Sequence, residues 1–452
     1  MKRTHTWTEK AREFFIVLVP IFVTQLALVA TGFCDTVMAG HFSSEDLAGV
    51  AVGANLYFPV FTTCISIISG LTPTIVHAYG AGKRWSIIFA VRQGFWQALF
   101  IAATVLSLGW LLVPPLIRSL QLAPRVEYVA LHWIMAISCG MPLIFLSAVL
   151  RNLLDSHGFT RLTMFVTLIT VPINIVANFF LVFGWGGFPA LGGIGSGIGT
   201  ALAHGINLLL NVLIVQFVRP FKDYHIFRRF VPPIWGACRR QLALGLPIGG
   251  AIFCEVSIFS AVGLFMAGYG TAVLAAHQAA LNFTTQVYMI PLSISMALTI
   301  LVGYELGSGR PIDARKYAKL GRILSFVVVG FVAALLIPLR DVISAIYTED
   351  PAVHELLLVF LAYTVGMQIA DALNAPLQGI LRGAKDVRAA FILAVASNWA
   401  AGLPIGWLLA EKFDLGPYGY WIGLIAGLML GGLFLGLRFH FVEKKWDAMY
   451  GK

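Results

Sequence analysis

The chain has 452 residues, of which 59% are hydrophobic and 12% are charged, whereas a soluble domain carries about 25% charged residues. This composition excludes an ordinary soluble protein, and the long apolar runs predict a polytopic α-helical membrane protein rather than a β-barrel of short alternating segments. The formal net charge of +10 does not indicate nucleic-acid binding, because the basic residues lie between the apolar runs.

The apolar runs predict twelve membrane spans. The first follows a basic N-terminus and is too long for the core of a signal peptide, so we expect it to be retained as a helix. The predicted spans cover residues 14–38, 47–76, 86–113, 126–150, 162–183, 194–218, 240–267, 273–303, 319–338, 353–377, 389–410 and 418–440.

The distribution of Lys and Arg predicts the orientation. An even number of spans places both termini on the same side, and the great majority of the 31 Lys and Arg residues fall on that side. Short loops rich in Lys and Arg remain in the cytoplasm. We therefore expect a multi-pass protein of a bacterial plasma (inner) membrane with both termini cytoplasmic.

The chain repeats itself with an offset of 227 residues, as in Pro20 and Pro247 or Asn55 and Asn282. Six spans separate the copies, so the two halves have the same orientation, as in transporters built from parallel repeats. The predicted architecture is all-α, with an N-terminal lobe at 1–218, a basic cytoplasmic linker at 219–239 and a C-terminal lobe at 240–452. Such halves suit alternating access, and a static pore is the alternative.

Glycine and proline predict how the spans pack and bend. Gly193–Gly199 and Gly419–Gly427 contain glycines at spacings that allow close helix packing. Several spans contain proline, which kinks a helix. Of these, we single out Pro20 as a candidate hinge.

Three acidic residues fall within spans, namely Asp35, Glu255 and Asp371. A charge at bilayer depth costs about 2.5–3.5 kcal/mol or more, and no Lys or Arg is placed deep in a span to pair with these carboxylates. They are expected to take up a proton or bind a cation. The alternatives are neutral hydrogen-bonded acids for Glu255 and Asp371, and a solvated carboxylate at the membrane edge for Asp35.

Polar side chains of the fifth and sixth spans extend this pattern. Asn174 and Asn178 are four residues apart and share one helix face, where Thr200 can approach them. Their amides can hydrogen-bond a carboxylate or offer oxygens to a cation, although interhelical hydrogen bonding alone is an alternative.

No motif of an enzyme or of a bound cofactor is found. The sequence has no GxSxG, P-loop or Rossmann fingerprint, and its histidines have no metal-binding spacing. The five cysteines form no CxxC pair, so neither a disulfide framework nor a metal cluster is predicted. We expect a protein that is not an enzyme and carries no cofactor beyond a coupling ion.

The sequence resembles the multidrug and toxic compound extrusion (MATE) family in its NorM-like branch, over essentially the whole chain. The resemblance is carried by Pro20, Cys34-Asp35-Thr36-Val37-Met38-Ala39-Gly40, Pro172 with Asn174, Asn178, Gly184, Pro189, Gly192 and Thr200, Glu255, Ala276-His277-Gln278, Asn282, Asp371, Gln378-Gly379 and Arg382-Gly383. It implies two six-helix lobes arranged as a V, and antiport of an organic cation against Na⁺ or H⁺.

The resemblance also implies roles for individual residues. Glu255 and Asp371 match the cation site of the C-terminal lobe, a tentative Na⁺ site, and Tyr288 and Phe259 match aromatic positions beside it. Asp35, Asn174, Asn178 and Thr200 match the cation or proton site of the N-terminal lobe; archaeal-type members carry Asp where this chain has Asn178. The implied substrate contacts are Asp35, Glu255, Asp371, Gln278 and Asn282.

The expected function is multidrug efflux, with organic cation drugs or toxins as substrates and a role in antibiotic resistance. Buried acids beside aromatic side chains are typical of sites for flat apolar cations. We expect a monomer in the lipid bilayer. The rivals are a lipid-linked precursor flippase of the same superfamily, which predicts a basic cavity, and an intramembrane enzyme or receptor.

Overall fold

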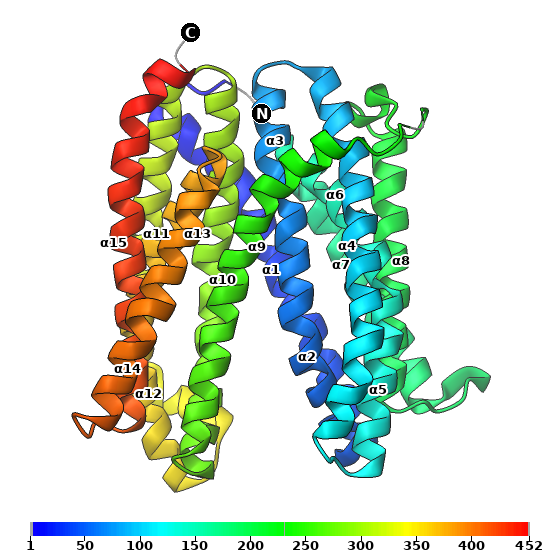
Figure 1. Cartoon of the computed structure of the whole chain (residues 1–452), viewed down its shortest axis with the longest axis vertical. Coiled ribbons are helices and arrows are strands. Elements are labelled where there is room, and N and C mark those ends of the chain that lie inside the picture. Colours follow the sequence, from blue (N-terminus) through cyan, green and yellow to red (C-terminus); the bar gives the residue numbers. More distant parts are fainter. Residues whose placement is uncertain (1–2, 230, 451–452) are drawn as a thin grey trace. The chain divides into compact units, whose positions relative to one another are not determined.

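The computed structural model describes residues 3–229 and 231–450, and this part of the chain contains helices and no strand (Figure 1). Eleven of its helices are long and apolar enough to cross a membrane, or twelve when one bent pair counts as a single span. That pair is α5 (Pro124–Cys139) and α6 (Met141–Ser156), bent by 41°. The bend falls at Gly140 and Pro142, inside the predicted fourth span, so the twelve predicted spans agree with the structure.

The chain folds into two compact units. The N-terminal unit is Val19–Gly249, and the C-terminal unit is Gly250–Lys452 together with Met1–Leu18. The expected lobe boundaries differ at both joins. Residue Lys10 is fully buried, forms an ion pair with Asp313 at 2.9 Å and hydrogen-bonds Thr4. These contacts attach the first turns of the chain to the C-terminal unit, and the helix passes into the N-terminal unit just before Pro20.

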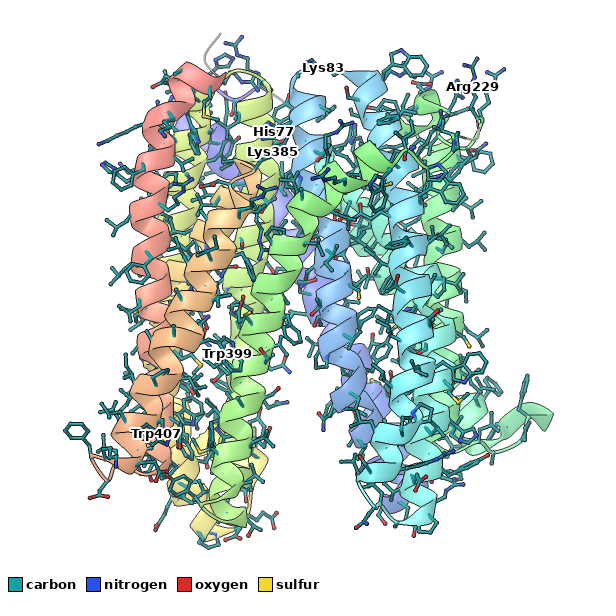
Figure 2. The ribbon with its side chains drawn as sticks, in the orientation of Figure 1. His77, Lys83, Arg229, Lys385, Trp399 and Trp407 are labelled. Carbon is teal, nitrogen blue, oxygen red and sulfur yellow. The ribbon has the colours of Figure 1, made fainter. Side chains whose placement is uncertain are left out.

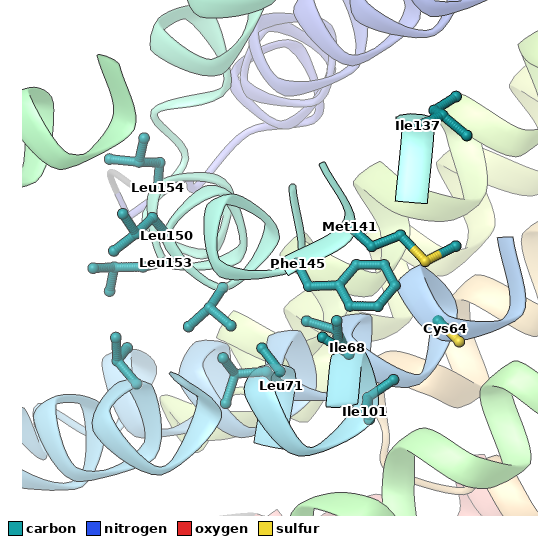
Figure 3. Close-up of a cluster of buried hydrophobic side chains, with 14 of the residues drawn as sticks. Cys64, Ile68, Leu71, Ile101, Ile137, Met141, Phe145, Leu150, Leu153 and Leu154 are labelled. Atoms are coloured by element: carbon teal, nitrogen blue, oxygen red, sulfur yellow. The ribbon is translucent and has the colours of Figure 1, made fainter. Parts of the chain in front are cut away.

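The N-terminal unit contains α5, α6 and seven further helices, wholly or in part, which are α1 (Trp7–Phe42), α2 (Ser44–Ser69), α3 (Leu71–Gly80), α4 (Arg84–Ser119), α7 (Thr160–Phe183), α8 (Gly193–Phe217) and the first part of α9 (Trp235–Ala267). Two short 3-10 turns, η1 (Trp185–Gly187) and η2 (Phe221–Tyr224), follow α7 and α8. Its core gathers aliphatic side chains around Phe145, where α2, α3, α4, α5 and α6 meet (Figure 3).

The C-terminal unit is built from the second part of α9 (Trp235–Ala267) and the elements that follow it. These are α10 (Thr271–Gly307), α11 (Pro311–Tyr347), α12 (Pro351–Gly383), α13 (Val387–Val395), the π-helical turn η3 (Ala396–Gly402), α14 (Leu403–Glu411) and α15 (Pro417–Tyr450). Helix α12 packs against α10, α11 and α15, so its side chains face the centre of this unit.

Two of the predicted glycine-rich contacts bring helices close together. In α8, a Cβ on Gly195 would lie 2.6 Å from the backbone of Leu181 in α7, and a Cβ on Gly199 would overlap the side-chain oxygen of Asn178. In α15, a Cβ on Gly423 would overlap Gly406 of α14. Glycine at these positions therefore lets α8 approach the polar face of α7.

Further acids at the ends of spans are buried, which the sequence did not predict. Asp46 of α2 is fully buried and forms a 2.9 Å ion pair with Arg125, and its carboxylate also accepts the backbone N–H of Gly193 at 2.6 Å. In α6 and α10, Asp155 and Glu305 are likewise buried and paired with neighbouring arginines. Each of these carboxylates has an Arg partner, which distinguishes it from Asp35.

The start of the linker is anchored by His157, which follows α6. Its Nδ1 lies 2.8 Å from the carbonyl oxygen of Leu153, and its Nε2 lies 2.7 Å from the hydroxyl of Tyr224 in η2. A carbonyl only accepts, so Nδ1 carries the proton and Tyr224 donates to Nε2. Burial lowers the pKa of His157 to about 4 and raises the pKa of Tyr224 to about 12.

We expect this histidine to make the protein less stable in acid. With a pKa near 6.5 when unfolded and about 4 when folded, His157 binds more protons in the unfolded chain between these values. Stability falls as the pH drops from 6.5 to 4, by roughly 3 kcal/mol in total, and changes no further below 4. His157→Gln should flatten the pH dependence of thermal unfolding in detergent over this window.

The matched control for that measurement is His225→Asn. His225 is exposed and has a positive φ of 48°, a conformation that Asn tolerates. This variant should retain the acid sensitivity of the wild type. An unchanged slope in His157→Gln would show that another group causes the acid sensitivity.

Candidate functional site

In the N-terminal unit, four polar side chains of three helices form one hydrogen-bonded cluster around Asp35 of α1. The Nδ2 of Asn178 donates to one carboxylate oxygen at 2.5 Å, and the hydroxyl of Thr200 donates to the other at 3.1 Å. Asn174 donates to the Thr200 oxygen at 3.0 Å and accepts from Asn178 at 3.2 Å. The structure thus brings together the four residues that the sequence singled out in this half, and we name them the Asp35 cluster.

The Asp35 carboxylate accepts every hydrogen bond that it makes in this cluster. Asn178 and Thr200 donate to it directly, and Asn174 donates to Thr200, which is an arrangement that suits an ionised carboxylate. Asn174, Asn178 and Thr200 are buried. The side-chain oxygen of Asn178 is buried with no hydrogen-bond partner in the described part of the chain. This oxygen faces Gly199 of α8, where a Cβ would overlap it.

In the C-terminal unit, a second cluster forms around Glu255 of α9. The hydroxyl of Tyr288 in α10 hydrogen-bonds the Glu255 carboxylate, and Asp371 of α12 interacts electrostatically with it. Asp371 is 5% exposed and Glu255 is half-buried. Two carboxylates and a phenol from three helices therefore share one region, which we name the Glu255 cluster.

The sequence places no Lys or Arg deep in a predicted span to pair with these acids, but a basic side chain just beyond one of the spans interacts with Glu255. Arg382, in the last turn of α12, interacts electrostatically with both Glu255 and Tyr288. One of its N–H groups donates to Gln378 at 3.0 Å, and Gln378 donates to Asn374 at 2.7 Å. These two hydrogen bonds lie on one face of α12 and hold the Arg382 guanidinium. The Glu255 cluster therefore includes a cationic side chain of the protein itself.

Helix α9 is held in position beside this cluster by Trp399 of η3. The indole N–H of Trp399 donates to the backbone carbonyl of Cys254 at 3.0 Å, and Figure 2 shows Trp399 beside α9. One residue farther along the chain is Glu255. A π-helical turn widens the helix by one residue and is frequent at functional sites. Here the π-helical turn supplies the indole that hydrogen-bonds α9 at the residue before Glu255.

The other predicted site residues occupy separate positions. Phe259 is half-buried one turn from Glu255 on α9. Asn282 is exposed and accepts a hydrogen bond from the Tyr347 hydroxyl at 2.9 Å, and Gln278 is exposed beside Gly263. Pro20 is buried within α1, and its carbonyl accepts a bond from Thr24. Its role as a hinge stays a prediction.

The ligands available to a coupling ion follow from this inventory. In the described residues, no three His, Cys, Asp or Glu side chains gather in a group that could hold a metal ion. A Na⁺ ion at Glu255 would therefore complete its shell with hydroxyl, backbone carbonyl or water oxygens, which are the hard ligands that such ions accept.

Comparison with known proteins gives the family. The MatE family model matches residues 20–180 and 247–408. The chain therefore belongs to the MatE family. The two matched stretches begin 227 positions apart, which confirms the predicted duplication. MatE proteins are membrane transporters and not enzymes, so the expectation of a transporter is confirmed.

Individual relatives support the same assignment. The protein named "Probable multidrug resistance protein NorM" of Halalkalibacterium halodurans is 43% identical over 99% of this chain and 98% of its own length. The protein of the same name from Bacillus subtilis is 42% identical over 99% of both chains. The crystal structure of the eukaryotic MATE transporter AtDTX14 has a TM-score of 0.88 at 19% identity, covering 98% of this chain and 99% of that one. The MatE transporter described here therefore has the MATE fold.

Proposed function

We propose that this MatE transporter is a multidrug efflux antiporter that exports organic cations in exchange for Na⁺ or H⁺. The relatives named as multidrug resistance proteins support this proposal, since they match nearly the whole chain. The observation that carries it is the Glu255 cluster, which places two acids and a phenol together at span depth. A carboxylate pair can exchange one bound cation for another.

The coupling rests on competition for negative charge. A carboxylate neutralised by a proton or by Na⁺ attracts an organic cation less. By linkage, a bound organic cation lowers the affinity for the coupling ion by the same factor. Arg382 is a third cation in this competition, because it already interacts with Glu255. Three positive groups thus compete for the same carboxylates: the coupling ion, the organic cation and the guanidinium of Arg382. Binding of one of them weakens the interaction of the carboxylates with the others.

The two clusters differ in composition, which suggests that they bind different coupling ions. The Glu255 cluster holds two carboxylates, which suit Na⁺, whereas the Asp35 cluster holds one carboxylate among amides and a hydroxyl, which suits a proton. We propose that the protein is a monomer in a bacterial inner membrane. The Lys and Arg distribution supports a cytoplasmic position for both termini.

The direct test is transport by purified protein in liposomes. Proteoliposomes loaded with ethidium or tetraphenylphosphonium receive an inward Na⁺ gradient at equal pH, or an inward proton gradient in sodium-free choline buffer. Potassium and valinomycin clamp the membrane potential in both cases. Protein-free liposomes and the exposed acid variant Asp341→Asn, which removes one negative charge outside both clusters, serve as controls.

We expect efflux of the organic cation under at least one gradient, at a rate that the Asp341→Asn protein matches. Efflux under Na⁺ alone would assign Na⁺ as the coupling ion, and efflux under the proton gradient alone would assign H⁺. The absence of efflux under both gradients would contradict the antiporter and favour the flippase, which should then move a lipid-linked diphosphate in the same liposomes.

A further inference from the structure

The second half of α11 carries a broad apolar surface that plays no part in the exchange described above. Its large exposed side chains include Phe331, Leu335, Ile337, Leu339, Val342 and Ile346. Helix α11 packs mainly against α10 and α12 of its own unit, and these side chains remain exposed beside them. Lipid tails are as apolar as such side chains, so this surface suits the acyl chains of membrane lipids.

A groove interrupts this surface where α11 meets α12. Each helix supplies three residues at positions i, i+1 and i+4, which share one helix face. Leu336 and Leu361 are buried and form the floor, whereas Ile337 and Ala362 are exposed and form the rims. We name the lining the α11–α12 groove, which consists of Leu336, Ile337, Arg340, Leu361, Ala362 and Val365.

Arg340 is the one polar residue of the α11–α12 groove. Its side chain is exposed, and among the described residues none forms a hydrogen bond or an ion pair with its guanidinium. Even Asp341, the next residue, is not paired with it. Other arginines of this unit are paired, since Arg315 contacts Asp447 and Arg438 contacts Asp386. The guanidinium of Arg340 is therefore free to bind an acceptor from outside the chain.

The position of Arg340 along α11 matches the level of the lipid headgroups. The predicted span 319–338 ends two residues before it, and an arginine at the end of a span extends its guanidinium to the membrane interface. The planar donors of a guanidinium fit a phosphate group. Leu336 and Ile337 lie about one turn closer to the centre of the span, which is the direction in which an acyl chain leaves its headgroup.

We propose that the α11–α12 groove binds a phospholipid, with the phosphodiester on Arg340 and one acyl chain along the apolar lining. The charge of the guanidinium complements the phosphate, and the apolar residues of both helices complement the chain. A free phosphate would use the guanidinium alone, and a lipid without phosphate would use the lining alone. The two contributions together distinguish this site from the surrounding apolar surface.

Two photoreactive lipids isolate the contribution of the phosphate. One is a phosphatidylglycerol with a diazirine on an acyl chain, and the other is the diacylglycerol with the same chains and no phosphate. Each is illuminated with the purified full-length protein in dodecyl maltoside, a detergent that contains no phosphate. Mass spectrometry then compares labelling of the groove with labelling of residues 165–176 in α7, which carry exposed apolar side chains and report non-specific contact.

Three variants separate the parts of the site. Arg340→Gln removes the charge and keeps much of the length of the side chain. Arg118→Gln is the matched control, because Arg118 is an exposed arginine in the last turn of α4, is likewise unpaired among the described residues and is not part of the groove. Ala362→Leu fills the groove from an exposed rim, which the fold should tolerate. Thermal unfolding confirms that each variant is folded.

In the wild type, phosphatidylglycerol should label the groove about tenfold more strongly than the diacylglycerol, as expected for one hydrogen bond between charged groups. This preference should fall to about one in Arg340→Gln and persist in Arg118→Gln. Ala362→Leu should reduce labelling of the groove by both lipids several-fold, because the added side chain occupies the position of the acyl chain.

Equal labelling by the two lipids in the wild type, or a preference that persists in Arg340→Gln or is lost equally in Arg118→Gln, would overturn the proposal. Displacement of the labelled lipid by inorganic phosphate alone would also overturn it and identify Arg340 as a simple anion site. The labelling requires no ion gradient and no transported cation, so its outcome is independent of the proposed antiport.

Discussion

Glu255→Gln is expected to lower the affinity of the C-terminal unit for the coupling cation at least about 30-fold and to stop Na⁺-driven efflux. Glutamine keeps the size of the side chain and can still accept the Tyr288 hydrogen bond, so the fold should persist. It removes the negative charge, and losing one partner of a buried charge pair costs about 2–5 kcal/mol. The checks are ²²Na⁺ binding to purified protein and efflux from proteoliposomes.

Asp371→Asn provides the comparison within the same cluster, and Asp341→Asn provides the control for a lost charge. Asp371 interacts with Glu255, so the two single variants and the double variant form a thermodynamic cycle. Removing both carboxylates should cost less than the sum of the single losses, because the pair acts on one ion. Unchanged Na⁺ binding in both single variants would exclude the Glu255 cluster as the coupling site.

Much of the fold could be predicted from the sequence because the signals are physical and local. Apolar length predicts spans, and the repeat separated by 227 residues predicts two equivalent halves, which the family match beginning at residues 20 and 247 confirms. The unit boundaries were harder to predict. The first turns of α1 join the C-terminal unit through Lys10 and Asp313, and a buried ion pair of residues 303 positions apart leaves no local pattern.

The candidate site was predicted in part. Asp35, Asn174, Asn178 and Thr200 come together as their helix faces suggested. Arg382 was missed because it lies five residues beyond the predicted span 353–377, in a helix that continues to Gly383, and its approach to Glu255 depends on how α9 and α12 pack.

The repeat held a signal for Arg382. A shift of 227 residues superposes it on Asp155 and superposes Gln378 on Arg151. In the N-terminal unit, Arg151 and Asp155 form an ion pair four residues apart, and in the C-terminal unit, Gln378 and Arg382 form the equivalent hydrogen bond. The fold is duplicated, while the sign of the charge at this position is reversed.

Asp35→Asn is expected to stop efflux driven by a proton gradient, while leaving the protein folded and its Na⁺ binding intact. The carboxylate accepts from both Asn178 and Thr200, and an asparagine can satisfy one of these donors but cannot take up and release a proton. We expect a loss of roughly 100-fold or more in proton-driven efflux, the lower end of the contribution that a positioned proton-transfer group makes. Efflux that persists at the wild-type rate would place proton coupling outside the Asp35 cluster.

A charge swap distinguishes loss of the titratable group from loss of structure. Asn178 lies directly across a hydrogen bond from Asp35, so Asn178→Asp in the Asp35→Asn protein returns one carboxylate to the cluster from the neighbouring helix. The same amide and acid are then present with their positions exchanged, and Thr200 and Asn174 remain beside them. Recovery of proton-driven efflux in the double variant would show that a single titratable carboxylate within this hydrogen-bonded cluster is sufficient. Failure to recover, in a protein that unfolds at the wild-type temperature, would show that the carboxylate must be on α1, the helix that links the two units.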